Sequence, residues 1–190
     1  PSIDQYSGMT VSLPAAYGSS RQLLFLGMGG SAVAGELLAD LATREGLSIP
    51  VSVHRDYGLP SVAGPETLVV ACSYSGNTEE TLSGFRAALD HGCRLLVVTS
   101  GGELGRSARE KGIPLLTVGV EAPPRATLPY TFPALLRLLQ NLGLFILRIQ
   151  SKGLINLRDR VGKVALLLVG NRVLIKFPGL GSVVQLLLNS

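Results

Sequence analysis

Hydroxyl side chains are concentrated in one short segment, where they could hold a phosphate group. Within the sequence ACSYSGNTEET, Ser73, Ser75 and Thr78 follow the spacing S-x-S-x-x-T. Gly76 and Asn77 tolerate left-handed backbone angles, so a tight turn can gather the three hydroxyls on one side. Hydroxyls and backbone N–H groups at a helix start bind a phosphate without lysine. The segment is therefore predicted to bind a phosphate, although Thr78 could also be an ordinary helix cap.

A second glycine-rich segment raises an alternative chemistry. Gly27, Gly29 and Ala32 fit the dinucleotide fingerprint G-x-G-x-x-G/A between an expected strand and an expected helix. Asp56 lies a few residues beyond the next expected strand, where a nicotinamide enzyme uses an acid to bind the ribose. An NAD-binding enzyme is thus one hypothesis, but it leaves the hydroxyl-rich segment without a role.

The elements that must position these segments alternate along the chain. Strands are expected at 22–26, 51–53, 67–72, 94–99 and 114–118, and helices at 31–44, 79–90, 104–111 and 132–149. This alternation predicts a doubly wound α/β fold, with a five-stranded, mostly parallel sheet flanked by helices. In such sheets ligands bind at the carboxyl ends of strands, which makes the segments 27–31, 73–78 and 99–102 the candidate sites.

Composition and charge exclude several other classes of function. Hydrophobic residues make up 46% of the 190 residues and aromatic residues only 5%, with no tryptophan, which disfavours an aromatic-lined nucleic-acid site. The net charge of +4 comes from residues 141–190, where seven Lys and Arg stand against one acid. A basic, apolar tail of this kind is more typical of a solvated surface than of a nucleic-acid site.

Cysteine usage and hydropathy indicate a soluble protein of a reducing compartment. Cys72 and Cys93 lie at opposite edges of the expected sheet, so neither a disulfide nor a metal site is expected, and a cytoplasmic location is predicted. The most apolar stretch, 132–149, is interrupted by Arg137 and Arg148. It is therefore expected to be a buried amphipathic helix rather than a membrane span.

Four segments together resemble the sugar isomerase (SIS) domain, and more closely the bifunctional phosphoglucose/phosphomannose isomerases. They are LGMGGSAVAG at 26–35, CSYSGNTEET at 72–81, VTSGG at 98–102 and PPRA at 123–126. The resemblance extends over roughly residues 2–145 and includes RDYGLP at 55–60. The hydroxyl-rich segment is specific for the SIS domain, and the first and last segments narrow the resemblance to this subfamily.

The resemblance implies a role for each matching residue. Ser73, Ser75 and Thr78 would hold the phosphate of a hexose 6-phosphate, while Gly30 and Ser31 would contact the substrate. Arg125 would lie over the reacting carbons and stabilise the negative charge of a cis-enediol(ate) intermediate. Without the family pattern, Arg125 would be interpreted as a surface arginine in a proline-rich loop.

The implied activity is an aldose–ketose isomerisation that interconverts fructose 6-phosphate with glucose 6-phosphate and mannose 6-phosphate. It uses no cofactor and no metal, and no nucleic-acid or membrane partner is expected. A homodimer is expected, since active sites of the family lie at domain and subunit interfaces.

The chain departs from the family pattern after its first domain. Members of the family have two SIS domains, and the second supplies the glutamate base and the ring-opening histidine. Residues 1–145 are expected to form the first domain, 146–165 a linker, and 166–190 the truncated start of a second. In this alignment Leu188 takes the position of the base, and leucine cannot abstract a proton.

No other residue is expected to replace the missing groups. His54 and His91 fall outside the candidate loops, and Glu79 and Glu80 would complement the dipole of a helix start. A catalytically inactive sugar-phosphate-binding module is therefore the main alternative to the isomerase.

Overall fold

The computed structural model describes residues 11–45, 49–119 and 128–144, together with four strands between residues 154 and 187. Five strands form the main sheet: β1 (Gln22–Leu26), β2 (Val51–His54), β3 (Thr67–Cys72), β4 (Arg94–Thr99) and β5 (Leu115–Thr117). The helices are α2 (Gly29–Glu45), α3 (Glu79–Asp90), α4 (Gly102–Glu110) and α5 (Leu128–Asn141), preceded by the short 3-10 helix η1 (Ala15–Ser19).

All five strands of this sheet run parallel, in the order β2-β1-β3-β4-β5. The chain leaves β1 towards β2 on one side and then returns to build β3, β4 and β5 on the other. The direction of winding therefore reverses between β1 and β3. In doubly wound sheets the loops at such a point diverge to opposite faces and leave a crevice between them.

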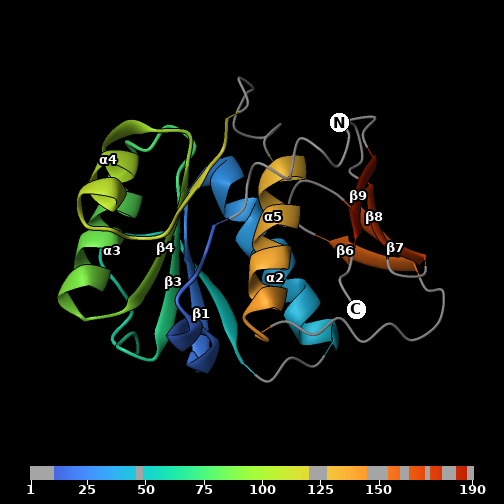
Figure 1. The fold of residues 1–190 in the computed structure, drawn as a ribbon, viewed down its shortest axis with the longest axis horizontal. Coiled ribbons are helices and arrows are strands. Elements are labelled where there is room, and N and C mark those ends of the chain that lie inside the picture. The colour runs from blue at the N-terminus through green and yellow to red at the C-terminus, as the bar shows by residue number, and fades with distance from the viewer. Residues whose placement is uncertain are drawn as a thin grey trace.

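Helices cover both faces of the sheet, as predicted. Figure 1 shows α2 and α5 on one face and α3 and α4 on the other. The two hydrophobic clusters divide in the same way, because alternate residues of each strand point to opposite faces. In β3, for example, Val70 packs towards α2 and α5, and Val69 towards α3 and α4. All six residues of β3 are consequently buried, which explains its continuous apolar run.

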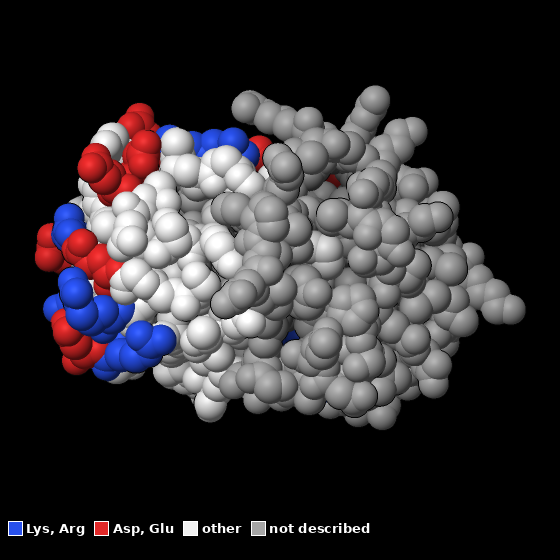
Figure 2. All heavy atoms as spheres, turned by 90° about the horizontal axis from the view of Figure 1, so that it is seen from above, with Lys and Arg blue, Asp and Glu red and all other residues white. Residues whose placement is uncertain are grey.

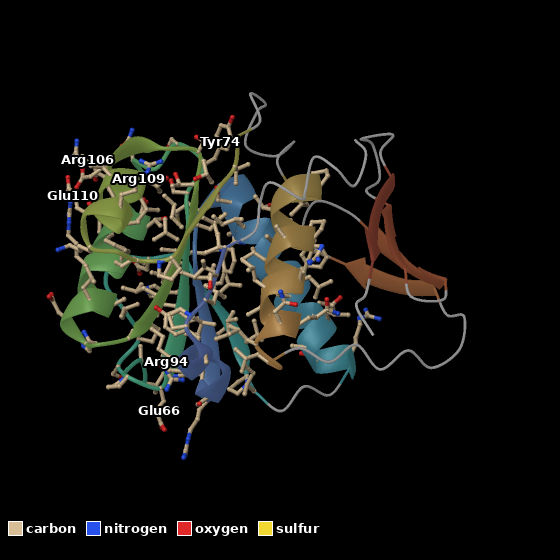
Figure 3. All side chains as sticks on the ribbon, viewed as in Figure 1. Glu66, Tyr74, Arg94, Arg106, Arg109 and Glu110 are labelled. Atoms are coloured by element: carbon tan, nitrogen blue, oxygen red, sulfur yellow. The ribbon has the colours of Figure 1, made fainter. Side chains whose placement is uncertain are left out.

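The two ends of the sheet differ in what covers them. The amino end is closed by the segment that contains η1, where the Tyr17 hydroxyl donates to the Leu95 carbonyl at 3.1 Å. Arg94 donates to the Ser20 hydroxyl at 2.9 Å at this same end. In Figure 3 Arg94 and Glu66 lie at this end, whereas Tyr74 lies at the opposite end, beyond the carboxyl end of β3. The candidate loops are therefore gathered at the end of the sheet away from η1.

The predicted helix at 132–149 is placed differently in the structure. α5 begins at Leu128 and ends at Asn141, and residues 145–149 lie outside the described residues. Gly143, with a φ of +69°, terminates the helix. The N–H of Gly143 donates to the Gln140 carbonyl, and that of Leu144 to the Leu139 carbonyl, which is a Schellman motif. The apolar pattern of the sequence continues beyond Gly143, so the predicted end of this helix at residue 149 was wrong.

Beyond residue 153 the structure contains a second, antiparallel sheet. Its strands are β6 (Leu154–Arg158), β7 (Lys163–Val169), β8 (Arg172–Lys176) and β9 (Val183–Leu187), each paired with the next. The predicted linker, 146–165, thus contains β6 and the start of β7, and the predicted second domain, 166–190, contains the rest. These strands lie where the linker and the truncated start of a second SIS domain are expected. The division into domains stays a prediction, and Leu188 lies outside the described residues.

Candidate functional site

Two loops meet at the reversal point of the sheet. One joins β1 to α2 and is followed by Gly30 and Ser31 in the first turn of α2, and the other joins β3 to α3 and contains the hydroxyl-rich segment Ser73–Thr78. The N–H of Tyr74 donates to the Ser31 hydroxyl at 3.2 Å, which connects the second loop to the first turn of α2. The structure therefore brings together five of the six site residues predicted from the sequence: Gly30, Ser31, Ser73, Ser75 and Thr78. Arg125 lies outside the described residues.

The three hydroxyls of the second loop are gathered in one turn but are not equivalent. Ser73 is buried, and its Oγ lies 2.8 Å from Oγ1 of Thr78 and accepts the N–H of Gly76 at 3.1 Å. Ser75 is exposed, and its Oγ accepts the N–H of Asn77 at 3.3 Å. Ser73 therefore shapes the turn from within, whereas Ser75 is exposed and Thr78 is half-buried.

Thr78 is not a side-chain cap of the helix that follows it. It occupies the N-cap position of α3, yet its side chain makes no capping hydrogen bond and turns to Ser73 instead. The first backbone bond within the helix is donated by Leu82 to the Thr78 carbonyl at 3.0 Å. The orphan N–H groups of the first turn, with the positive end of the helix dipole, are thus left for an anion. This geometry supports phosphate binding over the ordinary-cap interpretation.

The loop after β4 supports the hydroxyl-rich loop from the side. The Tyr74 carbonyl accepts two hydrogen bonds from Ser100, one from its N–H at 3.1 Å and one from the Ser100 hydroxyl at 2.6 Å. The Asn77 side chain accepts the N–H of Glu103 at 2.9 Å, so that this asparagine supplies an acceptor to the start of α4. The segment 99–102, predicted as a third candidate loop, therefore serves to hold the second loop in place.

Gly76 has no room for a side chain, which leads to a test of the loop's rigidity. Its φ is +71°, and a Cβ at this position would meet the Gly101 carbonyl oxygen at 1.9 Å. Gly76→Ala is expected to lower the free energy of unfolding by roughly 3 kcal/mol or more, since both the backbone angle and the backbone contact oppose it. Thermal unfolding measures the effect. Gly64→Ala is the matched control, because a Cβ there meets no atom within 4 Å. Equal stability of the two variants would contradict this close approach.

Cys72 lies beneath the two loops and is chemically inert. The side chain is buried, and this burial raises the pKa of the thiol to about 12, with a smaller, opposing effect from a hydrogen bond with Ser31. The thiol therefore stays protonated and packs like an apolar side chain. Both cysteines are free, as predicted.

The side chains of the two histidines lie within hydrogen-bond distance of carbonyl groups three or four residues away in the chain. Nδ1 of His91 lies 2.7 Å from the Ala87 carbonyl, at the end of α3 that is remote from the hydroxyl-rich loop. Nε2 of His54 lies 3.3 Å from the Tyr57 carbonyl. Glu79 and Glu80 occupy the first turn of α3, as predicted. None of these observations supplies the missing base.

Sequence interpretation missed the role of Tyr57. Its hydroxyl donates to Oε2 of Glu79 at 3.1 Å, although 22 residues separate the two along the chain. No local signal identifies such a pair, because it depends on how the loop after β2 lies against α3.

Charged side chains of both signs lie on the surface formed by α3 and α4. Figure 2 shows basic and acidic side chains interspersed over the end of the molecule formed by α3 and α4. Ion pairs there include Arg86 with Glu103 and Arg106 with Glu110. Such mixed charge is typical of a solvated surface. In the part of the chain that the structure describes, no helix is both long and apolar enough to span a membrane, and no group of three or more ligating side chains could bind a metal.

Comparison with known proteins identifies related sequences. No family model matches the chain. A bifunctional phosphoglucose/phosphomannose isomerase of Caldicellulosiruptor bescii is 40% identical over 137 residues, which cover 72% of this chain and 40% of that protein. The isomerase of the same name from Aquifex aeolicus is 38% identical over a region that covers 62% of this chain and 37% of that protein. A D-glucosamine-6-phosphate 4-epimerase of Sulfolobus acidocaldarius is 38% identical over a region that covers 64% of this chain and 38% of that protein. The chain thus spans about two fifths of the length of these relatives.

Solved structures of sugar isomerase domains share the fold. The sugar isomerase domain of an RpiR transcription factor from Sphaerobacter thermophilus aligns over 74% of this chain and 83% of its own, with a TM-score of 0.53 and 18% identity. The C-terminal domain of glucosamine-fructose-6-phosphate aminotransferase from Francisella tularensis aligns over 68% of this chain and 39% of its own, with a TM-score of 0.52 and 16% identity. The predicted resemblance and the predicted fold class are both confirmed.

Proposed function

We propose that this chain forms the sugar-phosphate-binding part of an aldose–ketose isomerase. The chain has the fold of a sugar isomerase domain and is related in sequence to bifunctional phosphoglucose/phosphomannose isomerases. The reaction interconverts fructose 6-phosphate with glucose 6-phosphate and mannose 6-phosphate. One observation carries the proposal. The hydroxyls of Ser73, Ser75 and Thr78 surround a helix start that no side chain caps.

The phosphate is bound by Ser75, Thr78 and the first N–H groups of α3, with Ser73 holding the turn behind them. Each hydrogen bond to a charged oxygen contributes roughly 1.5 to 3 kcal/mol. The helix dipole adds up to about 2 kcal/mol. These contributions suffice for a dianion without a lysine. Gly30 and Ser31, in the first turn of α2, contact the sugar, which extends from the phosphate across the reversal point of the sheet.

The isomerisation transfers a proton between C1 and C2 of the open-chain sugar. A base removes the proton from one carbon, the electron pair forms the C1–C2 double bond of a cis-enediol(ate), and a proton returns to the other carbon. Arg125 stabilises the oxyanion that develops, because a fixed guanidinium is preorganised for this charge. This role rests on the family pattern.

The alternative is a sugar-phosphate-binding module without catalysis. The observation that favours it is the leucine at position 188, which aligns with the glutamate base and cannot abstract a proton. A regulatory use of this fold has a precedent in the transcription factor whose sugar isomerase domain aligns with this chain. The isomerase remains the main proposal, because Arg125 is needed for an enediolate and not for a phosphate.

Three further features complete the proposal: a homodimer, a cytoplasmic location and activity towards both hexose epimers. The homodimer follows from the resemblance, the cytoplasmic location from the two free cysteines, and the activity towards both epimers from the names of the relatives. Members of the family build the active site at domain and subunit interfaces, which would supply the base and the histidine from elsewhere.

A coupled assay tests the activity directly. The chain is supplied with fructose 6-phosphate, and the appearance of glucose 6-phosphate and mannose 6-phosphate is followed separately. Formation of both products supports a bifunctional isomerase. If the hexose phosphate binds and neither product forms, the chain has the binding part without a working base, either as an inactive module or as a part separated from its catalytic half, whereas absence of binding contradicts both.

A further inference from the structure

The loop after β2 bridges the helices on the two faces of the sheet. At one end Arg55 forms an ion pair with Glu36 of α2. At the other the Tyr57 hydroxyl donates to Glu79 at 3.1 Å, and the N–H of Gly58 donates to the Ser83 hydroxyl at 3.1 Å, both on α3. The loop therefore passes over the carboxyl ends of the strands. Its hydrogen bonds to α3 involve residues of the first two turns of that helix.

Tyr57 acts through its hydroxyl rather than through packing. The residue is 56% exposed, which is unusual for a large aromatic residue and leaves little burial to stabilise it. The pKa of the phenol is raised, first by the hydrogen bond to Glu79, then by the charge of Glu79, with smaller effects from burial and from the charges of Glu80 and Asp56. The phenol thus stays protonated and remains a donor.

Glu79 is a natural competitor of a bound phosphate. It is the first residue of α3, where a carboxylate is attracted to the unpaired N–H groups and the positive end of the dipole. A carboxylate at this position would also repel a phosphate dianion nearby. In the structure Oε2 of Glu79 is instead engaged by the Tyr57 hydroxyl, on a different loop.

We propose that Tyr57 is a positioning residue that holds the Glu79 carboxylate on the loop after β2, away from the phosphate-binding turn Ser73–Thr78. The inference rests on the proposed function, because it assumes that the turn binds the phosphate of a sugar. It adds a residue that touches neither the phosphate nor the sugar and that acts on affinity through Glu79.

A double-mutant cycle tests this role. Tyr57→Phe removes only the hydroxyl and is expected to weaken the binding of glucose 6-phosphate by about three- to tenfold, since the released carboxylate competes for the helix start. In a Glu79→Gln background the same substitution is expected to leave the affinity unchanged, because the competing charge is gone. Calorimetry gives the dissociation constants, and inorganic phosphate serves as a second probe.

Tyr17→Phe is the matched control. It removes a tyrosine hydroxyl that bonds to Leu95 at the opposite end of the sheet, so it is expected to leave the affinity for both probes unchanged. Tyrosine titration by NMR provides a readout that a purely structural role would not move. The pKa of Tyr57 is expected to fall towards its ordinary value in Glu79→Gln.

Three results would overturn the positioning role. Equal losses of affinity in both backgrounds would mean that Tyr57 acts independently of Glu79. A loss for glucose 6-phosphate but not for inorganic phosphate would mean that the ring contacts the sugar. If Ser75→Ala with Thr78→Ala impairs binding while Tyr57→Phe does not, only the positioning role fails. If the unaltered chain binds neither probe, the proposed function fails as well.

Discussion

Replacing Ser75 and Thr78 together by alanine is expected to abolish measurable binding of hexose 6-phosphates while the fold persists. Two hydrogen bonds to a charged group are lost, worth roughly 3 to 6 kcal/mol in total, or about two to four orders of magnitude in affinity. The fold is expected to survive because Ser75 is exposed and Thr78 does not cap α3. Ser73 keeps the N–H of Gly76, so the turn retains its internal hydrogen bond.

The matched control for this experiment removes one serine and one threonine hydroxyl elsewhere. Ser52 on β2 and Thr43 on α2 are both exposed and lie outside the candidate loops. Ser52→Ala with Thr43→Ala is expected to leave the affinity unchanged. Circular dichroism and thermal unfolding report the integrity of each variant. Unchanged affinity in the Ser75 and Thr78 double variant would refute the phosphate assignment.

Arg125→Ala is expected to reduce turnover far more than binding in any preparation that converts fructose 6-phosphate. The guanidinium is proposed to stabilise the charge that develops only in the enediolate, so its loss raises the barrier without removing a ground-state contact. The loss of one such preorganised group typically lowers kcat by about 10²- to 10³-fold. The dissociation constant for glucose 6-phosphate is expected to change by less than about threefold.

Two further substitutions make this result interpretable. Arg125→Lys keeps the charge but not the planar guanidinium, and is expected to recover part of the turnover. Arg106→Ala removes an exposed arginine of α4 that pairs with Glu110, and is expected to have no effect. If kcat stays unchanged in Arg125→Ala, or if its loss is matched by an equal loss of binding, Arg125 does not stabilise the enediolate.

The sequence predicted the parallel sheet well because each strand carried its own signal. β3 and β4 were predicted with the bounds found in the structure, since buried strands of a parallel sheet are apolar throughout and are bounded by glycine and polar residues. The end of α5 was missed because the apolar pattern continued past Gly143, whose left-handed conformation depends on hydrogen bonds to the preceding turn.

The antiparallel strands β6 to β9 were not predicted as a sheet. Their segments are short apolar runs, and periodicity alone does not show which strands pair or in which direction.

The candidate site could be located from the sequence, but its internal contacts could not. The spacing of Ser73, Ser75 and Thr78 indicated a cluster, and the fold class placed it at the carboxyl edge. That the Thr78 hydroxyl turns to Ser73, and that the Ser31 hydroxyl accepts from Tyr74, depend on side-chain directions set by the packed loops. The pair of Tyr57 and Glu79 depends on the path of a loop, which has no local sequence signal.

We propose above all that this chain binds the phosphate of a hexose 6-phosphate at the start of α3. Calorimetric titration of the chain with glucose 6-phosphate, with glucose and NADH as comparison ligands, tests it most directly. We expect saturable binding of glucose 6-phosphate, no binding of glucose at the same concentrations, and loss of binding in Ser75→Ala with Thr78→Ala. Binding of NADH with none of glucose 6-phosphate would contradict the account and favour the dinucleotide interpretation of the glycines after β1.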